Sequence, residues 1–131
     1  MTREEEENLR ALAARMFDAV AHDDMREVAD CYDEDVIIWH NFDDTEQSGA
    51  ENLAALATLP KRISDRSYED KRVEVFDGGF VQQHVLHGTR VGDNKRLTMA
   101  GIIICRVKNG KVIRLDEYLD SKDVAEFRKV F

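Results

Sequence analysis

Apolar residues in the first part of the chain recur with helical spacing. Between residues 3 and 21 they fall every three or four positions, at Leu9, Leu12, Ala13, Met16, Phe17 and Val20. This pattern predicts an amphipathic helix, with Thr2 as its N-cap and a run of glutamates near the positive end of its dipole. After an acidic break the spacing resumes and predicts a short second helix, whose apolar face is formed by Met25, Val28, Ala29 and Tyr32.

The middle of the chain predicts one strand, one loop and one further helix. Residues 36–40, Val-Ile-Ile-Trp-His, are mostly β-branched or aromatic and form a run too short for a helix. Residues 41–49 are polar and acidic, which is typical of a loop. Residues 50–59 place leucines on one side and precede Pro60, so we expect a short third helix that ends there.

The rest of the chain has the patterning of strands. Four strand-like runs span residues 67–76, 80–91, 96–108 and 111–120, and turn-forming residues separate them. The strongest turn signal is Asn109-Gly110, because both residues tolerate the positive φ of a type I′ turn. The sequence therefore predicts one α+β domain over residues 1–131, with three N-terminal helices packed on one face of a mostly antiparallel sheet.

The charge of the chain is unevenly distributed. It has 19 Lys and Arg against 27 Asp and Glu, and residues 1–35 hold 4 of the basic and 12 of the acidic ones. Without a basic stripe, neither nucleic acid nor an anionic membrane is expected as a partner. The acidic start is unlike a secretory signal, so we expect a cytoplasmic protein in which Cys31 and Cys105 are buried free thiols.

Side-chain alternation along the last predicted strand singles out Glu117. It shares a face with Ile113, Leu115 and Leu119, and burial among these aliphatic side chains would raise the pKa of its carboxyl and suit it to proton transfer. The alternative is a half-exposed glutamate paired with a lysine or an arginine. Glu117 is therefore a candidate catalytic residue.

Two histidines and a tyrosine complete the candidate site. His40 ends the first strand just before a loop, and His84 points to the opposite face from His87, so their spacing does not predict a metal pair. Each of His40 and His84 is either a structural histidine or part of the site. Tyr32 is expected to be buried, with its hydroxyl bonded to His40, to His84, to a ligand, or to a backbone carbonyl or water.

Three segments of the chain are similar to those of a known superfamily. They are Phe17-Asp18-Ala19-Val20, residues 28–36, and residues 109–120, in which Glu-Tyr-Leu-Asp follows a Gly-Lys hairpin. With the order of predicted elements, they make the chain resemble the nuclear transport factor two-like superfamily, and within it ketosteroid isomerase and the SnoaL-like polyketide cyclases. The resemblance covers nearly the whole chain.

This resemblance implies a strongly curved sheet that forms a cone with the helices, a cystatin-like α+β barrel with an apolar interior for a small molecule. The side chains expected to line the interior are Met16, Val20, Ile38, Leu56, Leu86, Met99, Gly101, Ile103 and Leu119. It also implies a homodimer through the outer face of the sheet. Trp39 points away from the interior, so we assign it to sheet packing or a subunit contact. Neither a metal ion nor a cofactor is expected.

The catalytic groups of ketosteroid isomerase do not carry over to this chain. Its aspartate at the end of the first strand falls on His40, its oxyanion-hole tyrosine near Met16, and its protonated aspartate near Ile103. Only an accessory pocket tyrosine has a match, at Tyr32. No inward arginine is expected that would complete the Asp-Arg-Asp set of the limonene-epoxide-hydrolase-like members.

Two functions are compatible with the sequence. In the first, His40 or His84, aided by Glu117 and Tyr32, moves a proton on a carbon next to a carbonyl, as in cyclisation, isomerisation or dehydration of a small apolar compound. In the second, the same fold binds a metabolite without turnover or serves as a dimeric scaffold. The choice depends on whether these side chains meet at one cavity.

Overall fold

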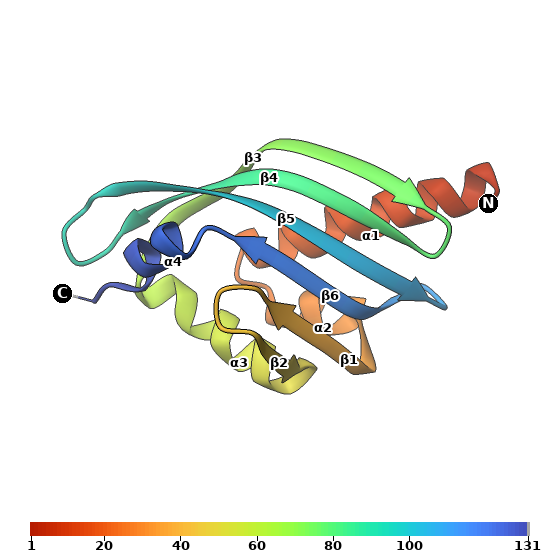
Figure 1. The fold of residues 1–131 in the computed structure, drawn as a ribbon, viewed down its shortest axis with the longest axis horizontal. Helices are drawn as coiled ribbons and strands as arrows, with labels where there is room; N and C mark the ends of the chain where they lie inside the picture. The colour runs from red at the N-terminus through yellow and green to blue at the C-terminus, as the bar shows by residue number, and fades with distance from the viewer. Residues whose placement is uncertain (131) are drawn as a thin grey trace.

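The computed structural model describes residues 1–130, and Figure 1 shows three helices that precede most of the strands along the chain and one that follows them. The elements follow in the order α1 (Arg3–Ala21), α2 (Met25–Cys31), β1 (Tyr32–His40), β2 (Thr45–Ser48), α3 (Gly49–Thr58), a 3-10 turn (Leu59–Lys61), β3 (Ile63–Phe76), β4 (Gly79–Arg90), β5 (Arg96–Lys108), β6 (Lys111–Leu119) and α4 (Ser121–Arg128).

The predicted first helix is confirmed, and its start is fixed by local hydrogen bonds. The Thr2 side chain accepts from the backbone N–H of Glu5, and the Glu5 carboxylate accepts from the backbone N–H of Thr2. This reciprocal capping box satisfies two of the N–H groups that a helix end leaves unpaired. The buried stripe of α1 is the predicted one, with Ala19 added: Leu9, Leu12, Ala13, Met16, Phe17, Ala19 and Val20.

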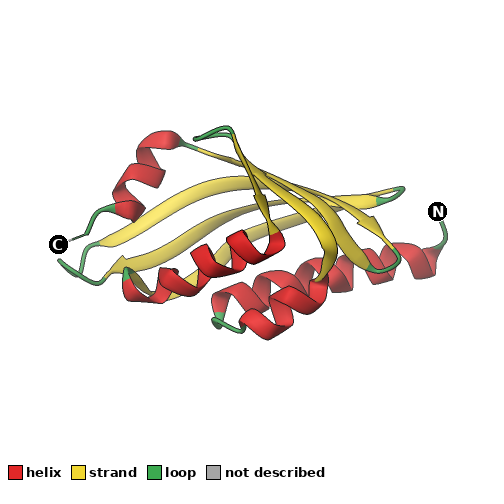
Figure 2. Cartoon of the chain, turned by 90° about the horizontal axis from the view of Figure 1, so that it is seen from below, coloured by secondary structure: helices red, strands yellow, loops and turns green. Residues whose placement is uncertain are grey.

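The strands form one sheet in the order β2-β1-β6-β5-β4-β3. β3 to β6 pair antiparallel in sequence, as predicted, while β1 runs parallel to β6. The sheet is curved, and α1, α2 and α3 lie together on one of its faces (Figure 2). The α+β class, the packing of the helices and the cone-like shape expected from the sequence are confirmed.

Two predictions for the first half of the chain are wrong in detail. Residues 41–49 were expected to be a loop, but Thr45–Ser48 forms β2, which pairs with the end of β1. Tyr32 was placed on the second helix, but it begins β1, and the helix ends at Cys31. The ring is nevertheless buried, because the first strand residue still faces the core.

The last strand contains a bulge that changes which of its residues are buried. Arg106 pairs with Arg114 but Val107 pairs with Val112, so Ile113 is the extra residue. As a result Val112 is fully buried and the prediction that Ile113 shares the inner face is wrong. Beyond the bulge, the alternation that places Leu115 and Glu117 on one face holds.

A helix that was not predicted from the sequence, α4, follows β6. Asp120 caps α4 by accepting from the backbone N–H groups of Lys122 and Asp123. Its buried side chains, Val124 and Phe127, join a second apolar cluster with residues of β3, β4 and β5, apart from the main core beneath α1 and α2. This second cluster forms the wall of one of the two cavities described below.

Cys31 and Cys105 are free and fully buried, as predicted. Over residues 1–130, no helix is long and apolar enough to cross a membrane.

Candidate active site

His40 and Glu117 meet where β1 and β6 lie side by side (Figure 1). They are direct partners in the parallel register, and His40 Nε2 lies 3.1 Å from Glu117 Oε1. Both side chains are largely buried, with 14% and 20% of their surfaces exposed. The pairing of Glu117 with a lysine or an arginine, the alternative left open by the sequence, is therefore not what the structure shows. Its partner is a predicted site residue.

Asn41 holds this pair in register. Its backbone N–H donates to the carbonyl of Glu117 at 3.0 Å. Its side-chain amide then takes the place of a further strand residue: Nδ2 donates to the Leu119 carbonyl at 3.1 Å, and Oδ1 accepts from the Leu119 N–H at 2.8 Å. Because the three bonds tie the end of β1 to β6, they fix where His40 stands opposite Glu117.

Two adjoining cavities open at the His40–Glu117 pair. The inner one has a volume of about 60 Å³ and lies between α1, α3 and the sheet, whereas the outer one has about 160 Å³ and lies against α4. Both are smaller than the roughly 300–1,000 Å³ that is usual for ligand pockets. The side chains that line both cavities are His40, Leu56, Tyr68 and Glu117. These four residues lie where the two cavities meet, a place called the junction below.

Eight of the nine residues expected to line the interior border one of these cavities. The inner cavity contacts Met16, Val20, Ile38, Leu56 and Ile103, and the outer cavity contacts Leu56, Leu86, Met99 and Leu119. Gly101 borders neither of them and contributes instead to a separate hollow, which His84, Ile102 and Tyr118 also line. A Cβ at Gly101 would lie 2.8 Å from Leu119 Cδ2 and 3.4 Å from His84 Nε2, so the glycine makes room for those two side chains.

Tyr32 lines the inner cavity, but its hydroxyl proton is already used. The hydroxyl donates to Asn52 Oδ1 at 2.8 Å, and Asn52 Nδ2 donates to Gln47 Oε1 at 3.2 Å. Its partner is therefore neither His40 nor His84, and it is not a backbone carbonyl. Burial raises the pKa of Tyr32 well above its usual range. Tyr32 can therefore bind a ligand by accepting a hydrogen bond, whereas donating one would require it to leave Asn52.

Tyr68 is a site residue that the sequence did not single out. Its ring borders both cavities, and its hydroxyl has no hydrogen-bond partner among residues 1–130. Burial raises the pKa of Tyr68 above its usual range, and the neighbouring charge of Glu117 acts in the same direction. The hydroxyl thus stays protonated and is available as a donor to a bound oxygen.

His84 does not reach either cavity. Its ring packs edge-on against Phe17 and Tyr68, with ring centres 5.3 and 4.6 Å away. Gln82 Nε2 donates to His84 Nδ1 at 3.0 Å, which places the proton of the neutral ring on Nε2. Burial lowers the pKa of His84. His84 is therefore a neutral side chain that supports Tyr68, while the other three predicted residues, Tyr32, His40 and Glu117, all line the inner cavity.

The described arginines that are most deeply buried point away from the inner cavity. Arg66 pairs with Asp23, and Arg90 is held by Asp93 and Glu126. Neither borders the inner or the outer cavity. Two other arginines, Arg62 and Arg128, do border the outer cavity.

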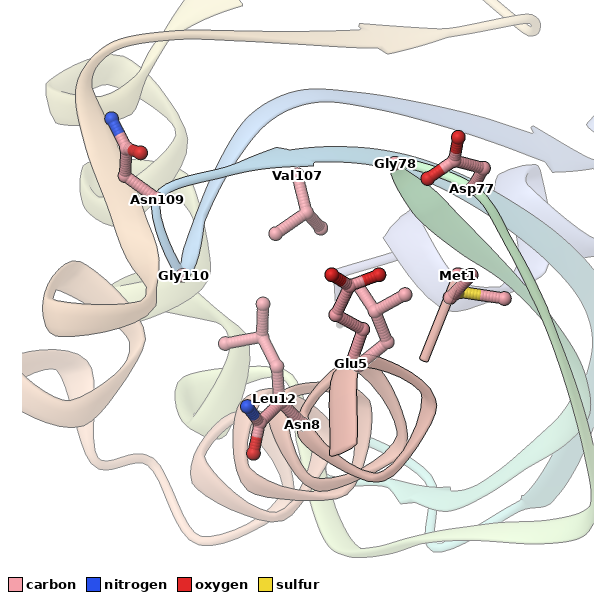
Figure 3. A pocket seen from close by; sticks show the side chains of 10 residues that line it. Met1, Glu5, Asn8, Leu12, Asp77, Gly78, Val107, Asn109 and Gly110 are labelled. Atoms are coloured by element: carbon pink, nitrogen blue, oxygen red, sulfur yellow. The ribbon is translucent and has the colours of Figure 1, made fainter. Parts of the chain in front are cut away.

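A separate pocket of about 370 Å³ lies at the opposite end of the sheet, between the start of α1 and the two hairpin turns (Figure 3). Its polar lining includes Glu5, Asn8, Asp77 and Asn109. Glu5 is committed to the helix cap, and no histidine lines the pocket. Across residues 1–130, no three acidic, histidine or cysteine side chains gather as metal ligands.

The match to a family model decides the relationship of the chain. Residues 13–115 match the model of the SnoaL-like domain. The chain belongs to the SnoaL-like family. This confirms the resemblance inferred from the sequence segments. No curated protein matches the chain.

Solved structures share the fold of this SnoaL-like protein at low sequence identity. A nuclear transport factor two-like protein of unknown function from Burkholderia pseudomallei is 15% identical, with a TM-score of 0.81 over 94% of this chain and 98% of its own. A protein from Xanthomonas campestris, described provisionally as a polyketide cyclase, is 16% identical, with a TM-score of 0.80 over 92% and 97%. A protein from Bacillus subtilis, described provisionally as an isomerase, is 16% identical, with a TM-score of 0.81 over 96% and 94%.

Proposed function

We propose that this SnoaL-like protein binds a small, mostly apolar carbonyl compound at the junction of the two cavities and moves a proton on the carbon next to the carbonyl. The observation that carries this proposal is the His40–Glu117 pair, 3.1 Å apart and facing both cavities. A buried acid–base pair beside an apolar cavity is the arrangement that proton abstraction from carbon needs.

In the proposed reaction Glu117 is the base. His40 Nε2 lies 3.1 Å from Glu117 Oε1, so the second carboxylate oxygen is left to take a proton from the substrate carbon. The electron pair of the broken C–H bond moves onto the carbonyl oxygen, and the unpartnered Tyr68 hydroxyl donates a hydrogen bond to that oxygen. If the proton on the Glu117 carboxyl is first replaced by a deuteron from solvent, delivery of that deuteron to the same carbon gives exchange, and delivery of the proton or deuteron to another carbon of an unsaturated substrate gives isomerisation. This differs from the sequence hypothesis in making His40 the residue that orients the base.

The volume of the cavities limits the substrate. An inner space of about 60 Å³ joined to an outer one of about 160 Å³ suits a single ring or a short chain rather than a polycyclic skeleton. The apolar lining of the outer cavity, which includes Leu86, Met99 and Leu119, supports an apolar body for the ligand. Provisional cyclase and isomerase assignments among the similar structures agree with carbonyl chemistry but do not carry it.

The test is deuterium exchange at the carbon next to a carbonyl. Acetophenone in deuterated buffer loses its methyl proton signal as exchange proceeds, and we expect the protein to accelerate this loss. Glu117→Gln should abolish the acceleration. Tyr68→Phe should reduce it by about 100-fold, which is the usual effect of removing one oxyanion donor.

A matched control lies outside the site. His87 Nδ1 and Glu69 Oε2 form a second histidine–glutamate pair, at 3.4 Å, and neither residue borders the cavities. Glu69→Gln should leave the exchange rate unchanged. Equal loss in Glu69→Gln and Glu117→Gln, or no acceleration with any ketone of this size, would contradict the proposed chemistry.

The small inner cavity supports a second function, which is binding without turnover. A cavity of about 60 Å³ leaves little room for a substrate to reorganise around Glu117. Under this alternative a ketone binds at the junction, but the rate of deuterium exchange stays at the level of buffer.

We also propose that the protein forms a homodimer through the outer face of its sheet. Ile37, Ile102 and Tyr118 are large apolar side chains exposed there, and Trp39 packs against Tyr118 with ring centres 5.3 Å apart. Light scattering should give twice the mass of one chain, and Ile102→Glu should shift it to that of one chain. A monomeric wild-type protein would contradict this proposal.

A further inference from the structure

The outer cavity has charge at both ends and apolar walls between them. Among residues 1–130, Glu117 is the one acidic side chain that lines it, and it lies at the inner end, where it is close to His40. Arg62 and Arg128 line the outer cavity but not the inner one. A ligand that reaches Glu117 with one end would therefore meet two guanidinium groups with the other.

Neither guanidinium is neutralised by an acidic side chain within residues 1–130. Arg62 Nη1 donates to the backbone carbonyl of Phe127 at 3.4 Å, which leaves its other N–H groups available. Arg128 lies over the ring of Phe42, 4.7 Å from the ring centre, without an ion pair. Because the chain has eight more acidic than basic side chains, an arginine without an acidic partner is not explained by a shortage of acids.

Some arginines of other elements show a contrast. Arg66, Arg90, Arg96 and Arg114 each pair with at least one carboxylate, whereas Arg106, which lies over the Phe76 ring, has no such pair among residues 1–130 and borders neither cavity. Glu126 stands on α4 close to Arg128 in sequence, but it is held by Arg90 and Lys129. The two arginines at the outer cavity thus keep the donor geometry that a carboxylate accepts in bidentate fashion.

A line of stacked side chains connects this end of the cavity with the catalytic pair. The Phe42 ring lies beneath Arg128 and has its centre 5.2 Å from that of His40, whose Nε2 contacts Glu117. The apolar body of a ligand would lie along this line against Leu86, Met99 and Phe127, which border the same cavity. The distribution of charge then orients the ligand, since an anionic group is repelled by Glu117 and attracted by the arginines.

We propose that the outer cavity is an anion subsite and that the substrate is a small oxo-acid, with its carbonyl at the junction and its carboxylate on Arg62 and Arg128. This inference rests on the proposed function for the position of the carbonyl. The anion subsite itself is defined by binding alone. In this proposal α4 contributes to ligand binding, because the helix places Arg128 at the cavity and its Phe127 carbonyl accepts a hydrogen bond from Arg62.

The probes are two ligands of the same shape. 4-Acetylbenzoate carries a carboxylate across the ring from its acetyl group, and 4-acetylbenzamide replaces that carboxylate with a neutral amide. We expect the wild-type protein to bind the benzoate at least about tenfold more tightly than the benzamide, measured by calorimetry at low salt. Added salt should narrow this ratio, because it screens exposed charges.

Arg128→Gln is the first variant, since the residue is exposed and its loss should not prevent folding. It should reduce the ratio of the two affinities to below about threefold. Lys122→Gln removes a positive charge from the same helix but does not border the cavity, and should leave the ratio unchanged. Arg62→Gln and Arg62→Lys form a second pair, in which the lysine should recover part of the preference.

The outcomes separate this inference from the proposed function. Equal affinities of the wild-type protein for benzoate and benzamide, or equal ratios in Arg128→Gln and Lys122→Gln, would overturn the anion subsite even if acetophenone still exchanges deuterium. A strong preference for benzoate that depends on Arg128 would support the subsite even if no ketone exchanges, in which case only the proposed catalysis fails.

Discussion

The two tyrosines of the site should respond differently to loss of the hydroxyl. Tyr32 donates to Asn52, which is only 6% exposed, so Tyr32→Phe leaves the buried Asn52 Oδ1 without its donor. An unsatisfied buried acceptor costs about 1–3 kcal/mol of unfolding free energy. Tyr68→Phe breaks no hydrogen bond within residues 1–130. Its effect on stability should be about 0.5 kcal/mol or less, of either sign.

Urea unfolding followed by circular dichroism measures both changes, with the slope against urea checked for each variant. A double variant supplies the control. In Tyr32→Phe with Asn52→Leu the unpaired acceptor is gone, so the loss should be smaller than the sum of the two single losses. Asn52 also donates to Gln47, whose oxygen is only partly buried and can bond to water instead.

A loss of stability in Tyr68→Phe equal to that in Tyr32→Phe would contradict the assignment of an unpartnered hydroxyl to Tyr68. It would mean that the Tyr68 hydroxyl is committed to a structural bond and cannot serve a bound oxygen. Recovery of stability by Asn52→Leu would in turn confirm that the cost of Tyr32→Phe comes from Asn52 rather than from lost packing.

Three further variants test how the fold supports the site. Asn41→Ala, which removes both bonds to Leu119, should lower the deuterium-exchange rate severalfold while costing only about 1 kcal/mol in urea unfolding. Because burial lowers the pKa of His84, the unfolded chain binds a proton at a higher pH than the folded one, and the free energy of unfolding falls as the pH drops below about 6.5. In His84→Gln this free energy should fall less steeply with pH, by up to about 1.4 kcal/mol per pH unit. Gly79→Ala would place a Cβ 2.1 Å from the Cys105 carbonyl oxygen and should lower stability by about 3 kcal/mol or more, which thermal unfolding can measure.

The sequence predicted those features that depend on regular alternation. Glu117 faces the interior because β6 is regular beyond its bulge, and His40 ends a regular strand opposite it. What periodicity alone could not supply is the parallel pairing of β1 with β6, since the two strands are separated by most of the chain. That pairing brings His40 and Glu117 together.

Tyr68 was missed because β3 is irregular. Its register with β4 shifts between Ser64 and Ser67 and again between Glu69 and Arg72, so parity counted along the chain does not tell which face the tyrosine occupies. Asp65 and Asp70 adopt positive φ at these register shifts. An aspartate within a strand-like run is a local signal of such a shift, because aspartate tolerates positive φ better than most residues.

Helical spacing carries a local signal for both Asn52 and α4. Asn52 lies beside Leu53 and four residues before Leu56, on the face of α3 that packs toward the core. In α4, Val124 and Phe127 are three residues apart and follow Asp120 as the N-cap. Both signals are short, and neither indicates by itself that the residues reach a cavity.

Ligands should bind at the junction marked by His40 and Glu117 rather than in the pocket at the start of α1. Methionine methyl groups labelled with carbon-13 report on this directly. Met16 lines the inner cavity, Met99 lines the outer one, and Met1 lines the pocket at the other end. Titration with acetophenone should shift the signals of Met16 and Met99 and leave that of Met1 in place. A shift of the Met1 signal alone, or no shift of the Met16 and Met99 signals at saturating acetophenone, would contradict binding at the junction.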